Sequence, residues 1–371
     1  MDRLNLNCIG NQLLLFSLLV FLLIGISSAA DSGVTITDAL GRTVNLEKPA
    51  ERIGFTGYMI GEPLVLAGAW DKVVARDGYI SDPVIYSNLD SIPSISSPNV
   101  PYELNFEKIM EIKPDVMIMP VDKWDTSEDT IQQMIDSLEP EIPVVFLNLN
   151  DPDTFEENFE KLGIITGTGD KVNEYLDFFD RVIGSIREKT SSLPDSEKPK
   201  IFLKAAGYTP DQLATWGGKE TMTNQLWDIV GANSISKTLP TSWTEVDPEW
   251  LIGQDMDDII VQCWNVYYPE TFGYQATDPS HKLENGKKII DEISAMDVFS
   301  SSEAVTNGKV YLIHDPLVST ARFVVGAAYL AKWLHSDLFF DLDPVQIHQE
   351  YLTRYIGADY DLSTGGLDAY P

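Results

Sequence analysis

Aromatic side chains gather in predicted loops of the second half of this chain, at one inferred end of one lobe. They are Trp216, Trp243, Trp264, Tyr267 and Tyr268. Aromatic faces bury large apolar areas and attract cations, so a group of them suits a large, flat or partly apolar ligand. A metal chelate, a corrinoid or a porphyrin fits this description. The alternative is that half of these rings pack in the core or between lobes.

Three basic side chains are candidate ligand contacts near the ends of predicted strands: Lys123, His314 and Arg322. His314 could ligate a metal ion or a haem iron, or it could be a hydrogen-bonded loop histidine. Arg322 and Lys123 could pair with carboxylates of a ferric chelate or with an oxyanion such as molybdate, although Arg322 could equally form an internal salt bridge. The first half of the chain adds three predicted ligand contacts: Tyr58, Tyr79 and Trp124.

The sequence predicts a binding protein and not an enzyme. It holds no G-x-S-x-G elbow, no P-loop and no H-E-x-x-H, and its Gly-rich stretch at 163–169 follows a helix instead of a strand. Bare Zn²⁺ or Mn²⁺ would need several converging His and carboxylate ligands. We therefore predict no metal site and no cofactor, with any metal carried inside the ligand. An exported glycan-binding or adhesion module is the alternative from another class.

These loops must be positioned by an α/β scaffold, because apolar strand-like runs alternate with segments of helical period. Candidate strands at 52–57, 72–75, 116–119 and 143–149 alternate with helices in the first half, and the pattern restarts after residue 199. Such alternation predicts mainly parallel sheets, whose ligands lie beyond the carboxyl ends of the strands.

One long helix is predicted at 170–193, between the two α/β halves. Its apolar residues are spaced alternately by four and three, which marks one helix face: Val172, Leu176, Phe179, Ile183 and Ile186. We therefore predict an N-terminal lobe at 31–169, an interlobe helix at 170–193 and a C-terminal lobe at 194–371. Two lobes on one rod enclose a ligand cleft.

The N-terminus predicts export. Arg3, an apolar run and small residues up to Ala30 read as a signal peptide at 1–30, with an uncleaved membrane anchor as the alternative. Only Cys263 remains after that cut, so no internal disulfide forms. The formal charge of −31 argues against nucleic acid and anionic lipid as partners. We expect a periplasmic protein, or one on the outer face of the cytoplasmic membrane.

Several segments together resemble the extracytoplasmic solute-binding proteins of ABC importers for iron–siderophore, haem and cobalamin. They include ITDALGRTVNLEKPAERI (36–53), GEPLVLAGAWDKVVA (61–75), LNFEKIMEIKPDVMIM (104–119), VDPEWLIGQDMDDIIV (246–261) and ARFVVGAAYLAKWLHSDLF (321–339). The resemblance covers nearly all of the chain after the predicted signal peptide. It implies two α/β lobes joined by a long helix, with limited lobe motion on binding.

The resemblance also implies partners. Such proteins hand their ligand to a membrane permease with its ATPase, and a surface carboxylate on each lobe docks into arginine pockets of that permease. Glu62 matches the first of these positions, whereas the second holds Gln225, with Glu220 as a possible replacement on the same predicted helix. We expect a monomer that captures a metal complex, and an oxyanion carrier of the same fold is the alternative.

Overall fold

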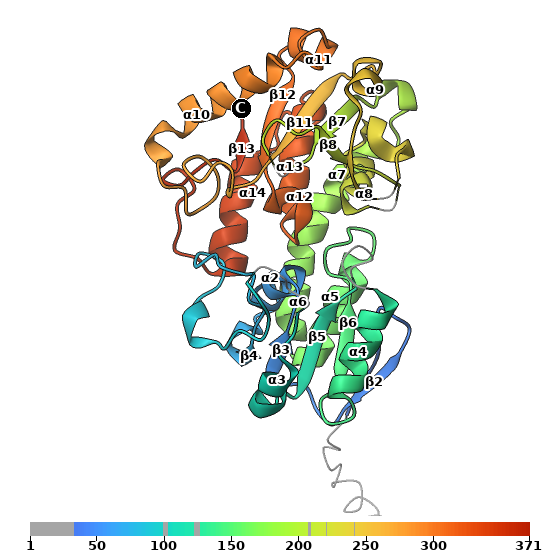
Figure 1. Cartoon of the computed structure of the whole chain (residues 1–371), viewed down its shortest axis with the longest axis vertical. Coiled ribbons are helices and arrows are strands. Elements are labelled where there is room, and N and C mark those ends of the chain that lie inside the picture. Colours follow the sequence, from blue (N-terminus) through green and yellow to red (C-terminus); the bar gives the residue numbers. More distant parts are fainter. Residues whose placement is uncertain (1–32, 99–102, 122–126, 207–208, 220, 241) are drawn as a thin grey trace, which may run out of the picture.

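The computed structural model describes residues 33–98, 103–121, 127–206, 209–219, 221–240 and 242–371. Figure 1 shows two α/β lobes stacked along the long axis, with a helical rod between them. The predicted fold class, two lobes with mainly parallel sheets joined by a long helix, is confirmed. The predicted signal peptide, Lys123, Trp124 and Glu220 lie outside the described residues.

The first lobe is built on a four-stranded parallel sheet in the order β4-β3-β5-β6. Its strands are β3 (Ile53–Phe55), β4 (Val73–Ala75), β5 (Val116–Pro120) and β6 (Val144–Leu147). The helical segments are α2 (Tyr58–Leu66), η1 (Trp70–Lys72), η2 (Leu89–Ser91), α3 (Phe106–Ile112), α4 (Glu128–Leu138) and α5 (Phe155–Thr166). An antiparallel hairpin of β1 (Val34–Thr37) and β2 (Thr43–Leu46) precedes them. The sheet strands are fully buried or nearly so, as their continuous apolar runs require.

The second lobe is built on a five-stranded sheet in the order β13-β12-β11-β7-β9. Its strands are β7 (Lys200–Lys204), β9 (Asn233–Ser234), β11 (Asp258–Cys263), β12 (Val310–His314) and β13 (Ala369–Tyr370), of which only β13 runs antiparallel to its neighbour. A separate antiparallel ribbon joins β8 (Ala214–Trp216) and β10 (Trp243–Glu245).

Helices cover this second sheet and carry the chain back toward the first lobe. They are α8 (Met222–Ile229), α9 (Pro248–Ile252), α10 (Lys282–Ser294), α11 (Glu303–Thr306), α12 (Pro316–Ser319), α13 (Phe323–Leu334) and α14 (Pro344–Glu350), which η7 (Tyr351–Ile356) extends. Short η4 (Asp195–Glu197), η5 (Ile235–Thr238) and η6 (Pro279–His281) complete the lobe.

The rod between the lobes runs from Gly169 to Thr190 as α6 (Gly169–Phe179), the π-helical η3 (Asp180–Gly184) and α7 (Ser185–Thr190). The rod begins one residue before the start of the helix predicted at 170–193 and ends three residues before its predicted end. Gly167 takes the left-handed conformation that closes α5 (φ 69°), and Thr168, not Asp170, is the N-cap residue of α6.

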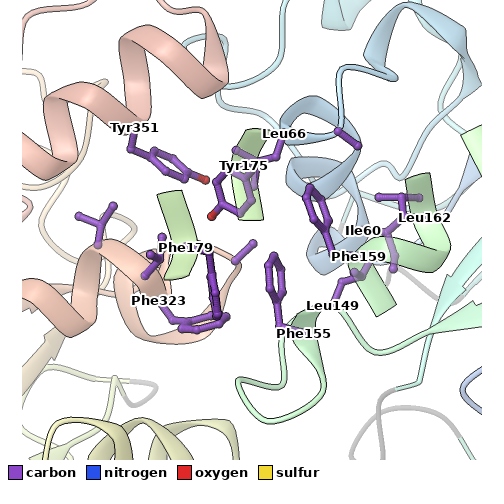
Figure 2. Close-up of a cluster of buried hydrophobic side chains, with 14 of the residues drawn as sticks. Ile60, Leu66, Leu149, Phe155, Phe159, Leu162, Tyr175, Phe179, Phe323 and Tyr351 are labelled. Carbon is purple, nitrogen blue, oxygen red and sulfur yellow. The ribbon is translucent and has the colours of Figure 1, made fainter. Parts of the chain in front are cut away.

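Buried aromatic rings pack the rod against both lobes (Figure 2). Phe155 of α5 stacks on Phe179 of the rod, with ring centroids 5.1 Å apart, and meets Phe323 of α13 edge-on at 5.5 Å. Tyr175 lies edge-on to Tyr351 of η7 at 6.3 Å. The two lobes are therefore joined by a close-packed core as well as by one helix, which restricts their relative motion.

Candidate ligand-binding cleft

Two adjoining hollows, of about 290 and 330 Å³, lie between the lobes. Both are lined by Tyr58, Trp216, Gln262 and Ser319, so they form one continuous cleft. The first lobe also supplies the residues Glu62, Tyr79–Asp82, Tyr86 and Asn150, and the second lobe supplies Trp243, Trp264, His314, Asp315 and Arg322, among others. The structure thus brings together Tyr58, Tyr79, Trp216, Trp243, Trp264, His314 and Arg322 of the predicted ligand contacts.

Asp77 fixes the first-lobe wall of the cleft. Its fully buried carboxylate accepts hydrogen bonds from the backbone N–H groups of Gly57 (2.9 Å) and Tyr79 (2.7 Å) and from the Thr56 hydroxyl (3.1 Å). These bonds tie together the loops after β3 and β4, and the rings of Tyr58 and Tyr79 lie 5.8 Å apart. Sequence reasoning missed Asp77, although an acid directly after a short buried strand is a signal for such a role.

Gln262 fixes the second-lobe wall. Its Oε1 accepts from the Trp216 indole N–H (3.3 Å) and the Ala206 backbone N–H (3.2 Å), and its Nε2 donates to Asp315 Oδ1 (2.6 Å). Trp243 pairs with Trp216 across the β8–β10 ribbon and donates to the Ala206 carbonyl at 3.2 Å. Gln262 was also missed, and its signal is a polar residue that directly follows the apolar run Ile259–Val261 of strand β11.

Trp264 lines the cleft and contacts the ring of Tyr267. The two rings meet edge-on at 87°, with centroids 5.5 Å apart. Tyr267 does not line either hollow among the described residues. We therefore expect Tyr267 to orient Trp264 instead of touching ligand itself.

Arg322 lines the cleft, but its charge is already engaged. Its Nε donates to Glu62 Oε1 at 2.7 Å, and both side chains are at least 94% buried. The Tyr351 hydroxyl donates to the same Glu62 oxygen. The internal salt bridge weighed from the sequence is therefore the observed state of Arg322. Glu62 faces the other lobe, which contradicts the surface placement that the resemblance implied for a docking carboxylate.

Gln225 also faces the other lobe. Its Nε2 donates to Asp151 Oδ2 of the first lobe at 3.3 Å, across the lobe boundary. Lys123, Trp124 and Glu220 lie outside the described residues, so their predicted roles stay predictions.

His314 is held at the end of β12 by Asp368 of the C-terminal segment. Its Nδ1 lies 3.2 Å from Asp368 Oδ1, and its Nε2 is buried without a hydrogen-bond partner among the described residues. Burial alone would raise the pKa of Asp368, but the hydrogen bond from His314 and nearby positive charge hold that pKa below its ordinary value. An ionised carboxylate only accepts hydrogen bonds, so His314 presents an N–H to Asp368 at Nδ1.

Two half-buried carboxylates also line the cleft, Asp82 from the first lobe and Asp315 from the second. Burial raises the pKa of Asp82, and the Arg322 guanidinium partly offsets this. Burial likewise raises the pKa of Asp315, against the effect of the Ser319 hydroxyl, which donates to Asp315 Oδ2 at 2.8 Å. Within the described parts of the chain, no group of three or more His, Cys, Asp or Glu residues forms a metal site.

No helix in the described ranges is long and apolar enough to cross a membrane.

Comparison with known proteins gives a consistent result. An uncharacterised ABC transporter substrate-binding lipoprotein of Bacillus subtilis, YvrC, is 23% identical over 311 residues, covering 82% of this chain and 87% of the relative. A vitamin B12-binding protein of Pectobacterium carotovorum is 21% identical over 221 residues, covering 59% of this chain and 70% of the relative.

The fold matches solved structures as well. The TroA-like periplasmic binding protein FepB of Veillonella parvula superposes with a TM-score of 0.73 at 21% identity, covering 91% of this chain and 99% of that one. Residues 57–317 match the family described as periplasmic binding protein. With its two lobes, its interlobe cleft and a match over most of its length, the chain belongs to the periplasmic binding protein family and is a solute-binding component of an ABC transporter.

Proposed function

We propose that this protein captures a metal complex, such as a ferric siderophore, a haem or a corrinoid, and delivers it to the permease of an ABC importer. The observation that carries the proposal is the aromatic lining contributed by both lobes: Tyr58 and Tyr79 from one, Trp216, Trp243 and Trp264 from the other. Rings on both walls suit a ligand with a broad, partly apolar surface.

The relatives support the same class of ligand. The Pectobacterium relative is named for binding vitamin B12, which is a corrinoid. Family membership favours transport over the glycan-binding or adhesion alternative, because the members act as binding components beside a permease and an ATPase. We therefore place the protein outside the cytoplasmic membrane, with residues 1–30 serving for export.

Docking to the permease calls for exposed carboxylates other than Glu62. Its carboxylate is about 98% buried against Arg322, so it is not accessible to an arginine pocket in this conformation. Glu220 remains the proposed docking residue of the second lobe, and the first lobe must offer another acid.

The test is a titration of the mature protein, followed by tryptophan fluorescence, with ferrioxamine B, haemin, cyanocobalamin and molybdate. We expect saturable quenching by at least one metal complex and a tenfold or greater loss of affinity in Trp264→Leu. Trp250→Leu is the matched control, because Trp250 is a half-buried tryptophan on α9 that lines neither hollow. Quenching by molybdate alone would indicate that the ligand is an oxyanion and not a metal complex. No response to any probe would refute the proposal.

A further inference from the structure

Gln262 lies where the two hollows of the cleft meet. It lines both of them, together with Trp216 and Ser319 of the same lobe and Tyr58 of the first lobe. The residue is only 5% exposed. A buried amide has to satisfy its donors and its acceptor mainly within the protein. Its hydrogen bonds therefore show which neighbouring elements it holds.

The direction of the Gln262 amide is fixed by its partners. On one side lie the backbone N–H of Ala206 (3.2 Å) and the indole N–H of Trp216 (3.3 Å), which can only donate. The amide oxygen must face them, so the NH2 group faces Asp315, whose Oδ1 accepts at 2.6 Å. Asp315 in turn accepts from the Ser319 hydroxyl at 2.8 Å. One side chain thus connects strand β8, the segment after β7 and the start of α12.

The same connection reaches a second tryptophan. Trp243 lies directly opposite Trp216 in the β8–β10 ribbon, and its indole N–H donates to the Ala206 carbonyl at 3.2 Å. Both tryptophans line the smaller hollow. An indole has a single N–H group, and in both residues this group is bonded to the protein. The pair therefore offers a ligand ring surface and no indole donor.

From these contacts we infer that Gln262 is a positioning residue for ligand binding. It holds the indole of Trp216 directly, and that of Trp243 through Ala206, in the orientation that receives the apolar part of the ligand. This inference rests on the proposed function. The β8–β10 ribbon is a separate two-stranded sheet, so its rings need such a tie to the main sheet of the lobe. Loss of the amide weakens binding although every ring of the cleft is still present.

Two substitutions separate the acceptor of this amide from its donor. Gln262→Met keeps the length of the side chain and removes both. Gln262→Glu keeps an oxygen for Ala206 and Trp216 but places its second oxygen against Asp315. Two carboxylates so close repel each other, so this variant needs one shared proton, which acidic conditions supply. Burial already raises the pKa of Asp315, which favours that proton. The other titratable groups that face Asp315 are His314, Arg322 and Tyr79.

Affinity is measured by tryptophan quenching with ferrioxamine B, haemin and cyanocobalamin at pH 5.5 and pH 8, each variant against the wild type at the same pH. For a probe that binds, we expect Gln262→Met to raise the dissociation constant at least tenfold at both pH values. Gln262→Glu should stay within threefold of the wild type at pH 5.5 and bind more weakly at pH 8. Gln254→Met is the matched control, because Gln254 is a half-buried glutamine that donates to the Trp250 carbonyl and lines neither hollow.

A second measurement observes the indole N–H groups directly, in ¹H–¹⁵N correlation spectra of protein labelled at tryptophan. The resonances are assigned by their loss in Trp216→Phe, Trp243→Phe and Trp250→Phe. In Gln262→Met we expect the Trp216 N–H to exchange with water at least tenfold faster than in the wild type, and the Trp243 resonance to shift. The Trp250 resonance, on α9, should stay in place.

The outcomes separate the two proposals. Unchanged exchange at Trp216 in Gln262→Met, or binding by this variant within twofold of the wild type, would overturn the positioning role. Binding by Gln262→Glu at pH 5.5 as weak as that of Gln262→Met would also overturn it, because restoring the hydrogen bonds would then restore nothing. If no probe bound the wild type, the proposed function would fall, while the indole spectra would still support or refute the position of Trp216.

Discussion

The ion pair between Glu62 and Arg322 joins the lobes where α2 faces the start of α13. Substituting Glu62→Gln keeps the size of the side chain and an oxygen for the Tyr351 hydroxyl, but it leaves the Arg322 guanidinium buried without a counter-charge. Since Arg322 is 5% exposed, water cannot readily compensate. Breaking a buried pair in this way costs about 3–5 kcal/mol of unfolding free energy.

The complementary substitution, Arg322→Met, leaves the Glu62 carboxylate buried without a counter-charge. It should lower the free energy of unfolding by a similar amount. The double variant Glu62→Gln with Arg322→Met removes both charges, so its loss should be much smaller than the sum of the two single losses. Urea denaturation at pH 7, followed by circular dichroism and by tryptophan fluorescence, measures all three free energies. Coincident transitions with both probes would justify two-state treatment.

Losses under about 1 kcal/mol in both single variants would refute the reasoning, because that is the range of exposed pairs. The exposed pair Lys287–Asp291 on α10 is the internal reference, with its charged atoms 2.6 Å apart and both side chains more than 60% exposed. Lys287→Met should leave the midpoint of urea denaturation close to that of the wild type, because an exposed pair contributes little to stability. A double variant as unstable as the sum of the single losses would show that the two residues act independently.

Two further predictions concern stability. His348 is fully buried, which lowers its pKa from 6.5 to about 4, so the folded state binds fewer protons than the unfolded state and stability falls as pH drops from 6.5 toward 4. At pH 4 this effect lowers the free energy of unfolding by about 3 kcal/mol relative to pH 7. His348→Gln should remove this part of the dependence of stability on pH. Separately, Gly326→Ala should destabilise by about 3 kcal/mol or more, because a Cβ there would lie 1.8 Å from the Leu317 carbonyl oxygen.

Each of these has an internal control. The exposed His281 has a pKa raised by its hydrogen bond to Asp278, so His281→Gln should leave the slope due to His348 in place. If His348→Gln kept the wild-type slope in urea titrations between pH 6.5 and 4.5, the assignment would be wrong. Gly184→Ala lies in the interlobe rod with open space around its Cβ and should stabilise by up to about 1 kcal/mol. Equal melting temperatures for the two glycine variants would contradict the steric argument.

The sequence predicted those elements whose signals are local. The candidate strands at 116–119 and 143–149 are observed as β5 and β6, and the helix predicted at 170–193 is observed as the rod from Gly169 to Thr190. These elements depend on periodicity and composition within a few residues. The parallel sheets followed from the alternation of such elements.

Contacts between distant segments were not predictable in this way. The C-terminal tail shows no periodic pattern, yet Ala369–Tyr370 adds an edge strand to β12 and Asp368 reaches His314. Asp77 and Gln262 were missed for the same reason, since their importance lies in loops that they join and not in their own sequence neighbourhood. Trp264 follows strand β11 and lines the cleft, because the position of a loop after a strand fixes which end of the sheet it occupies. Trp216 and Trp243, expected in loops, reach the cleft instead from the β8–β10 ribbon.

Helix α2 contributes both to the ligand cleft and to the contact between the lobes. It begins at Tyr58, directly after Gly57 (φ 83°), whose N–H donates to Asp77. Tyr58 and Glu62 therefore lie four residues apart on one helix face, and both line the same hollow. A ligand that displaces Tyr58 acts on the same helical turn that carries the ion pair to Arg322. Burial of Glu62 thus follows from the position of α2 at the cleft and at the contact between the lobes.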